Sequence, residues 1–262
     1  MQRTAIIVPC YNESQRLKGH EFTYYARKNR WIYFIFVNDG STDNTQEIID
    51  ELCSTNSSQI ISIRHSKNLG KAEAVRRGFL QAIELGVENI GYWDADLSTP
   101  LHSIDSLCGV LANDKITTVM GSRVKLLGRR IERLAIRHYL GRVFATFASL
   151  LLRLPVYDTQ CGAKIFKNND DIRKVFSLPF NVNWTFDVEI LARLRIIYRD
   201  RGSNFIEESV VEYPLEEWVH VADSRIKGGD CIFAVLELVK LCFLLYAPGI
   251  SSTYFNRLEN ET

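Results

Sequence analysis

The sequence predicts an α/β fold with a Rossmann-like, mostly parallel sheet and helices on both faces. In the first 120 residues, short apolar runs alternate with helix-like segments, the pattern of successive βαβ units. Polar, turn-rich loops follow four of these runs, at residues 9–13, 38–43, 65–71 and 94–99. Parallel sheets bind ligands at the carboxyl ends of their strands, so these loops are predicted to form the functional site.

The strands of the first half are predicted from continuous apolar runs, which indicate burial on both faces. They are expected at residues 4–10, 31–38, 59–64, 89–94 and 117–122. The first intervening helix is expected to end near residue 30. The second is expected to start at Thr42 and Asp43, which favour helix starts, and to end near residue 55. The third is expected over 71–85, and a fourth is expected to begin at Pro100.

The second half is predicted to be more helical. A long amphipathic helix is expected over 129–153, basic at its start and apolar at its end. A strand and a helix are expected between 161 and 198, a strand over 204–213 and a polar loop over 214–230. Residues 231–247 carry only two charges, Glu237 and Lys240, and are expected to form either a core helix or an interfacial helix.

The composition excludes several classes of protein. With 46% hydrophobic and 24% charged residues, the chain is neither disordered nor collagenous. Its 32 basic and 31 acidic residues give a net charge of +1, which argues against a nucleic-acid partner bound by bulk charge. The six cysteines show no CxxC spacing, so free thiols in a reducing compartment are expected rather than a zinc site.

The positive charge is concentrated in one segment. Residues 123–142 hold seven arginines and lysines against one glutamate, which suggests an anionic partner such as a membrane surface. Residues 231–247 span about 25 Å as a helix, less than the roughly 30 Å of a bilayer core. Peripheral attachment through 129–153 is therefore expected, and the apolar run 5–8 is too short for a signal peptide.

A D-x-D pair follows the fourth predicted strand. Asp94 and Asp96 lie on the same side of an extended chain at the sheet edge where ligands bind. Two carboxylates so close together repel each other unless a cation lies between them. Mg²⁺ or Mn²⁺, held by these carboxylates and by substrate phosphates, is the predicted occupant.

Two further loops carry candidate binding residues. Asp39 ends the second predicted strand in the run Asn38–Asp43, where its carboxylate is able to accept a hydrogen bond from a nucleobase. Lys71 follows Asn68 and Gly70 at a predicted helix start and is a candidate phosphate contact. Each loop alone is also explained by ordinary turn formation. Only the combination of the loops is a specific signal of function.

The combined order of the motifs resembles a known enzyme family. Val8–Glu13, Val37–Asp43, Asn68–Lys71 and Asp94–Asp96 occur in the register of the inverting GT-A glycosyltransferases of family 2. The runs Asp158–Lys164 (DTQCGAK) and Trp184–Glu189 (WTFDVE) resemble its polyprenyl-phosphate branch, and the dolichyl-phosphate glucosyltransferases in particular.

This resemblance implies roles for individual residues. The nucleoside pocket would be lined by Pro9, Tyr11, Glu13 and Asp39, and the metal and donor diphosphate would be held by Asp94 and Asp96. Arg123 would lie near the sugar or the acceptor phosphate, and Arg137 and Arg225 are further candidates for that phosphate. The sugar and acceptor side would be shaped by Asp158, Gln160, Trp184 and Asp187.

The resemblance implies hexose transfer, with UDP-glucose as the preferred donor, to a polyprenyl phosphate at the cytoplasmic face of a membrane. It implies a nucleotide-sugar core at 1–125, an acceptor-side half at 126–230 and an apolar helix with its tail at 231–262. Three alternatives remain open: a GDP-mannose donor, a saccharide hydroxyl as acceptor with Asp187 as base, and a non-catalytic protein that binds nucleotide sugar or lipid.

Overall fold

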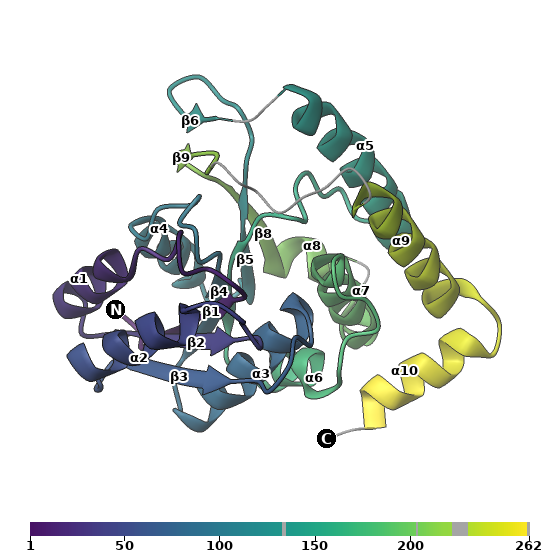
Figure 1. Cartoon of the computed structure of the whole chain (residues 1–262). Coiled ribbons are helices and arrows are strands. Elements are labelled where there is room, and N and C mark those ends of the chain that lie inside the picture. Colours follow the sequence, from purple (N-terminus) through teal and green to yellow (C-terminus); the bar gives the residue numbers. More distant parts are fainter. Residues whose placement is uncertain (133–134, 203, 222–229, 261–262) are drawn as a thin grey trace.

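The computed structural model of the chain has one large sheet between two layers of helices (Figure 1). It describes residues 1–132, 135–202, 204–221 and 230–260, with side chains for all of these except 135–138, 230–232 and 259–260. The α/β class and the mostly parallel sheet predicted from the sequence are confirmed.

The seven strands lie in the order β3-β2-β1-β4-β7-β5-β8. β7 runs antiparallel to β4 and β5, whereas the other neighbouring strands run parallel. The strands are β1 (Thr4–Cys10), β2 (Ile32–Asn38), β3 (Ile60–Arg64), β4 (Asn89–Trp93), β5 (Thr118–Ser122), β7 (Ala163–Lys167) and β8 (Val210–Pro214).

Helices cover both faces of the sheet and give it two cores. Alternation along β1 points Ile7 to one core and Ile6 and Val8 to the other. The second core lies under α1 (Gly19–Lys28), α2 (Thr45–Thr55) and α4 (Ser103–Leu111). The first core lies under α3 (Lys71–Glu84), α5 (Ala135–Leu152), α6 (Asp170–Ser177), α7 (Phe186–Ile197), α9 (Asp230–Tyr246) and α10 (Ile250–Asn260).

The helix expected over 129–153 begins later than predicted. α5 starts at Ala135, and Arg130–Ile131 forms the short strand β6, which pairs with β9 (Glu217–Trp218). The prediction of helix over 129–132 was wrong, because pairing with a strand far away in the sequence overrides local helix propensity.

The strand expected over 204–213 was only partly correct. Phe205–Ser209 forms the short helix α8, and β8 begins at Val210. In α8, Ile206 and Ser209 are buried while Glu207 and Glu208 are exposed. This spacing of three between buried positions belongs to a helical turn rather than a strand.

Ion pairs neutralise much of the basic segment 123–142. Arg123 pairs with Asp158, Arg129 pairs with Glu216, and Arg130 pairs with both Glu132 and Glu217. Three of these acids lie outside the segment, so its local excess of positive charge is smaller than the sequence alone suggests.

The chain ends in two helices joined at a sharp bend. Within the described residues, no single helix is long and apolar enough to cross a membrane. Phe233–Tyr246 and Ile250–Leu258, bent by 84°, pass that test of length and composition only when taken together.

Candidate active site

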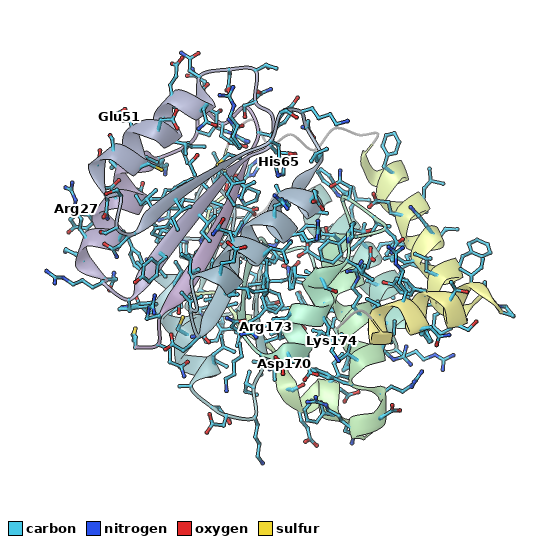
Figure 2. All side chains as sticks on the ribbon, turned by 90° about the horizontal axis from the view of Figure 1, so that it is seen from below. Arg27, Glu51, His65, Asp170, Arg173 and Lys174 are labelled. Carbon is cyan, nitrogen blue, oxygen red and sulfur yellow. The ribbon has the colours of Figure 1, made fainter. Side chains whose placement is uncertain are left out.

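The ends of several strands bring the predicted polar loops together at one edge of the sheet. Asp39 follows β2, His65 follows β3 and Asp94 follows β4. Because β7 is antiparallel, the loop that precedes it, residues 158–162, reaches the same edge. Figure 2 shows His65 at this end of the strands, well away from Arg173 of α6.

The D-x-D pair lies in a tight turn directly after β4. The carboxylate of Asp94 is 36% exposed, and that of Asp96 is half-buried and accepts a hydrogen bond from the backbone of Ser98 at 2.9 Å. Leu97 has a positive φ of 53°, an uncommon conformation for a residue with a side chain. The turn therefore holds two partly exposed carboxylates two residues apart in sequence.

The two carboxylates suit a divalent cation. Carboxylate oxygens are the ligands that Mg²⁺ and Mn²⁺ favour, and one or two of them suffice when substrate phosphates complete the shell. The described residues contain no cluster of three or more His, Cys, Asp and Glu side chains arranged to hold a metal. Asp94 and Asp96 therefore fit a metal whose other ligands come from a diphosphate and water.

Lys71 lies against the first carboxylate of the pair, with Nζ 2.7 Å from Oδ1 of Asp94. Burial disfavours the ammonium form, but the nearby carboxylates of Asp94 and Asp187 outweigh it and raise the pKa of Lys71. The structure thus brings a lysine from the start of α3 to the D-x-D pair, as a phosphate contact requires.

Asp39 is held in a buried cradle. Its Oδ1 accepts hydrogen bonds from Nδ1 of His65 at 2.8 Å and from the backbone of Leu69 at 2.9 Å, and its Oδ2 accepts one from the backbone of Gly70 at 2.7 Å. A carboxylate has about four lone-pair sites, so one remains for a ligand. His65 belongs to the predicted loop 65–71, but the sequence assigned its side chain no role, because a histidine after a strand has no distinctive pattern.

The other predicted nucleoside contacts lie near β1. Pro9 and Tyr11 are half-buried at the end of that strand. Glu13 is only 8% exposed, and its carboxylate forms a two-pronged ion pair with Arg16, at 2.7 and 3.0 Å. Glu13 is thus firmly bound within the protein, whereas Pro9 and Tyr11 border the edge of the sheet.

Arg123 follows β5 and is bound by Asp158. Nε and Nη2 of Arg123 each lie 2.7 Å from a different oxygen of the Asp158 carboxylate, which also accepts the backbone N–H of Arg123. Burial disfavours the charged guanidinium, but Asp158 outweighs it and raises the pKa of Arg123. Nη1 makes no hydrogen bond with the described residues.

Asp187 lies in a buried network beside the pair rather than at the surface. Its carboxylate is bound by Nζ of Lys164 and by the hydroxyl of Tyr92, and the residue is 4% exposed. Lys164 also donates to the carbonyls of Thr159 and Cys161. Asp187 therefore anchors the loop that precedes β7 through Lys164. The sequence gives no sign of this role, because Lys164 looks like an ordinary strand residue.

The remaining predicted residues are Gln160, Trp184, Arg137 and Arg225. Gln160 donates its backbone N–H to Asp158 at 3.3 Å, and Trp184 is 43% exposed at the start of α7. The side chain of Arg137, and all of Arg225, lie outside the described residues.

The sheet carries two carboxylates after its fourth strand, a lysine beside them and a buried aspartate after its second strand. This is the arrangement expected of a GT-A glycosyltransferase. A sequence profile for glycosyl transferase family 2 matches residues 5–172. The chain belongs to this family.

Similar proteins include two dolichyl-phosphate beta-glucosyltransferases. The chain is 31% identical over 258 residues to a dolichyl-phosphate beta-glucosyltransferase of Trichomonas vaginalis, covering 93% of this chain and 72% of the relative. It is 31% identical over 208 residues to the dolichyl-phosphate beta-glucosyltransferase of Saccharomyces cerevisiae, covering 71% of this chain and 61% of the relative.

Solved structures share the fold at low sequence identity. Glucosyl-3-phosphoglycerate synthase of M. tuberculosis is 16% identical with a TM-score of 0.65, over 92% of this chain and 80% of that one. A mannosyltransferase from Pyrobaculum calidifontis, solved with GDP-Man and Mn²⁺, is 15% identical with a TM-score of 0.60, over 98% of this chain and 69% of that one.

Proposed function

We propose that this protein transfers a hexose, with inversion, from a nucleotide diphosphate sugar to a polyprenyl phosphate, with UDP-glucose as the donor. The observation that carries the proposal is the contact of Lys71 with Asp94, two residues from Asp96. It brings a positive charge for a diphosphate next to carboxylates for its cation. The names of the Trichomonas and yeast relatives support glucose as the sugar and dolichyl phosphate as the acceptor.

The donor would lie across the carboxyl edge of the sheet. The base would enter beside Pro9 and Tyr11, where Oδ2 of Asp39 accepts from Gly70 and keeps a lone pair for a nucleobase N–H. The diphosphate would then reach Asp94, Asp96 and Lys71. The chain's fixed backbone and buried hydrogen bonds position these groups before the donor arrives, which lowers the cost of organising them during the reaction.

Mg²⁺ or Mn²⁺ held by Asp94 and Asp96 would supply Lewis-acid stabilisation of the departing diphosphate. Lys71 adds a positive charge at the same place. The acceptor phosphate is already ionised at neutral pH, so it needs no strong general base, and catalysis depends on alignment and charge stabilisation.

Arg123 is the proposed acceptor contact. Asp158 fixes the guanidinium through Nε and Nη2, so the remaining N–H groups are held in a defined direction for a phosphate oxygen. A saccharide hydroxyl would require an exposed carboxylate as base. The burial of Asp187 between Lys164 and Tyr92 favours the phosphate acceptor over that alternative.

An apolar surface offers a place for the lipid tail. α5 and α9 are in contact and lie along one side of the molecule (Figure 1). Both expose large apolar side chains, which together form what we call the α5–α9 apolar surface: Tyr139, Leu140, Val143, Phe147, Leu150, Phe233, Val235, Leu236, Val239, Phe243 and Tyr246. Exposed apolar side chains in this number, on two neighbouring helices, favour a protein or membrane contact, and peripheral attachment to a membrane through them forms part of the proposal.

The test is a transfer assay with the full chain. Radiolabelled UDP-glucose, UDP-N-acetylglucosamine and GDP-mannose are supplied separately with Mn²⁺ and dolichyl phosphate in liposomes. We expect lipid-linked sugar from UDP-glucose, with an inverted anomeric centre and no product after chelation of the metal. No lipid-linked product from any donor, or equal transfer to soluble saccharides, would overturn the proposal.

A further inference from the structure

The carboxylate of Glu237, in the apolar helix α9, binds the start of α7. It accepts backbone hydrogen bonds from Asn183 at 2.9 Å, Trp184 at 3.2 Å and Thr185 at 2.7 Å, and one from the hydroxyl of Thr185 at 2.9 Å. N–H groups at a helix start have no partner within the helix, and a negative charge is favourable there. Glu237 thus fixes the end of the loop 180–185.

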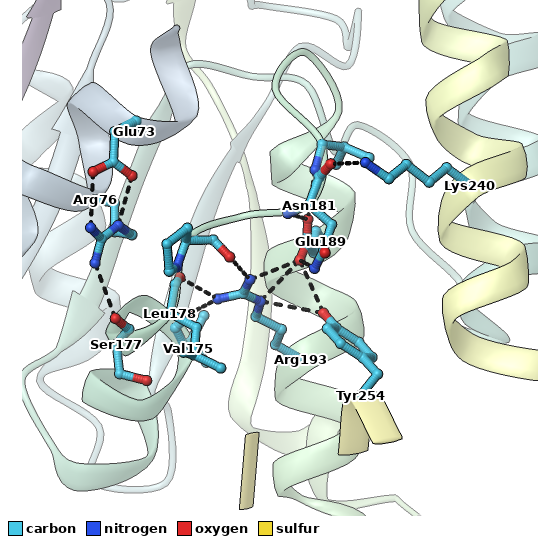
Figure 3. A network of polar contacts seen from close by, with 12 residues as sticks. Glu73, Arg76, Val175, Ser177, Leu178, Asn181, Glu189, Arg193, Lys240 and Tyr254 are labelled. Atoms are coloured by element: carbon cyan, nitrogen blue, oxygen red, sulfur yellow. Dashed lines mark hydrogen bonds and ion pairs between the residues drawn. The ribbon is translucent and has the colours of Figure 1, made fainter. Parts of the chain in front are cut away.

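The same loop is held by other contacts from the C-terminal helices. Nζ of Lys240 donates to the carbonyl of Asn181 at 2.6 Å. The backbone and side chain of Asn181 bind Glu189, whose carboxylate also binds Arg193 and accepts from the hydroxyl of Tyr254 in α10 (Figure 3). Lys240 of α9 therefore binds this loop directly, and Tyr254 of α10 supports it through Glu189.

The loop in turn touches the start of α3. Oδ1 of Asn183 accepts the backbone N–H of Ala72 at 3.3 Å. The amide of Asn183 also packs on Gly70, since a Cβ at Gly70 would lie 2.1 Å from Nδ2 of Asn183. Gly70 has a φ of 94°, so its conformation and this close approach both require glycine.

The start of α3 bears directly on the donor site. The backbone N–H of Gly70 donates to Asp39 at 2.7 Å, and Nζ of the next residue, Lys71, lies 2.7 Å from Asp94. A continuous series of polar and packing contacts therefore joins α9 to both carboxylates proposed to receive the nucleotide sugar.

We propose that Glu237 and Asn183 are positioning residues for donor binding: they hold the start of α3, and through it the two carboxylates, in the geometry that the nucleotide needs. This inference rests on the proposed function, because it takes the donor to bind at that edge. It follows that α9, which exposes apolar side chains, also supports the donor site. Loss of the Glu237 contacts is therefore expected to weaken nucleotide binding even without lipid or acceptor.

The experiment measures the dissociation constant of UDP in the presence of Mn²⁺ by calorimetry, without acceptor or lipid. We compare the wild type, Glu237→Ala, Asn183→Ala and the double variant. Each single substitution is expected to raise the dissociation constant about tenfold, equivalent to about 1.4 kcal/mol. The double variant is expected to bind about as weakly as either single one, because residues acting through the same contact are not additive.

The matched control is Tyr198→Phe. It removes a buried hydrogen bond to Thr117 at the other end of α7, and Tyr198 makes no hydrogen bond with Glu237, Asn183 or the rest of the loop 180–185, so it tests general loosening. Glu237→Gln, which keeps the shape and one acceptor oxygen, is expected to fall between wild type and Glu237→Ala. If Glu237→Ala folds poorly, Asn183→Ala tests the same contact from its other end.

Three results would overturn the inference: UDP affinity within twofold of wild type in both single variants, an equal loss in Tyr198→Phe, or fully additive losses in the double variant. Failure of the proposed function is distinguishable, because the wild-type protein would then bind no UDP.

Discussion

The guanidinium of Arg123 and the carboxylate of Asp158 form two parallel hydrogen bonds of 2.7 Å each. The two residues lie 35 positions apart and join the end of β5 to the loop before β7. The backbone N–H groups of Tyr157 and Asp158 in turn bind the carboxylate of Glu212 in β8. The acceptor-side loop is thereby tied to two strands.

Asp158→Asn is expected to lower the free energy of unfolding by about 3 kcal/mol, because it leaves the mostly buried guanidinium of Arg123 without its counter-charge. Urea denaturation measures the effect. The control is Arg130→Ala, which breaks ion pairs at a side chain that is 65% exposed and should barely change stability. Equal effects of the two substitutions would show that the Arg123–Asp158 pair contributes no more to the free energy of unfolding than an exposed ion pair.

Asp96→Asn is expected to lower turnover about 1,000-fold, because loss of a metal ligand removes several kcal/mol of charge stabilisation. The fold should survive, since asparagine is still able to accept the hydrogen bond from Ser98. Turnover is measured with UDP-glucose and dolichyl phosphate, and folding by the melting temperature. Asp114→Asn, at a fully exposed side chain, is the control. Turnover within tenfold of wild type would refute metal binding by Asp96.

Most of the parallel sheet was predictable from the sequence, because buried strands such as β1 and β4 are mainly apolar and are followed by polar loops. The direction of β7 was not, since an apolar run carries no signal for parallel or antiparallel pairing. β6 was missed for a related reason: Arg130–Ile131 forms a strand only because Glu217–Trp218 lies beside it.

The site was predictable to the extent that its residues follow strands. Lys71 and Asp94 are in contact at the predicted edge of the sheet, and Asp39 binds the backbone of Gly70 next to Lys71. The groups that support them were not predictable, because their partners are distant in sequence. Lys164 in β7 reads as a strand residue, and Glu237 as an isolated charge in an apolar helix, until the fold brings each to its partners.

Asp43 is expected to make stability depend on pH in the acid range. Burial opposes ionisation, but hydrogen bonds from Thr45 and Ser14 outweigh it and lower the pKa of Asp43 to about 2, from 3.8. A lowered pKa in the folded state contributes stability above the unfolded value, and this is lost as pH falls through the folded value. The contribution should therefore decline between about pH 5 and pH 2.

The measurement compares Asp43→Asn with wild type by urea denaturation at pH 7 and at pH 3. We expect a loss of about 1 kcal/mol at pH 7, the low end for hydrogen bonds to an ionised group that remains accessible to water. The loss should be smaller at pH 3. A loss that is equal at both pH values would exclude ionisation as its cause, leaving only the geometry of the hydrogen bonds.

The α5–α9 apolar surface is expected to bind membranes through its aromatic side chains. Phe147 of α5 and Phe243 of α9 are each 60% exposed, and burying such a side chain in an apolar phase contributes about 1.5–3 kcal/mol. The double variant Phe147→Glu with Phe243→Glu should therefore reduce sedimentation with anionic liposomes by at least about tenfold. Its turnover on a short-chain, water-soluble polyprenyl phosphate should be retained, because neither residue contacts the donor site.

Tyr24→Glu is the control, since Tyr24 is 61% exposed on α1, on the other side of the molecule (Figure 1). If the control reduced sedimentation as strongly as the double variant, added negative charge alone would explain the loss, and the apolar surface would not be the membrane contact.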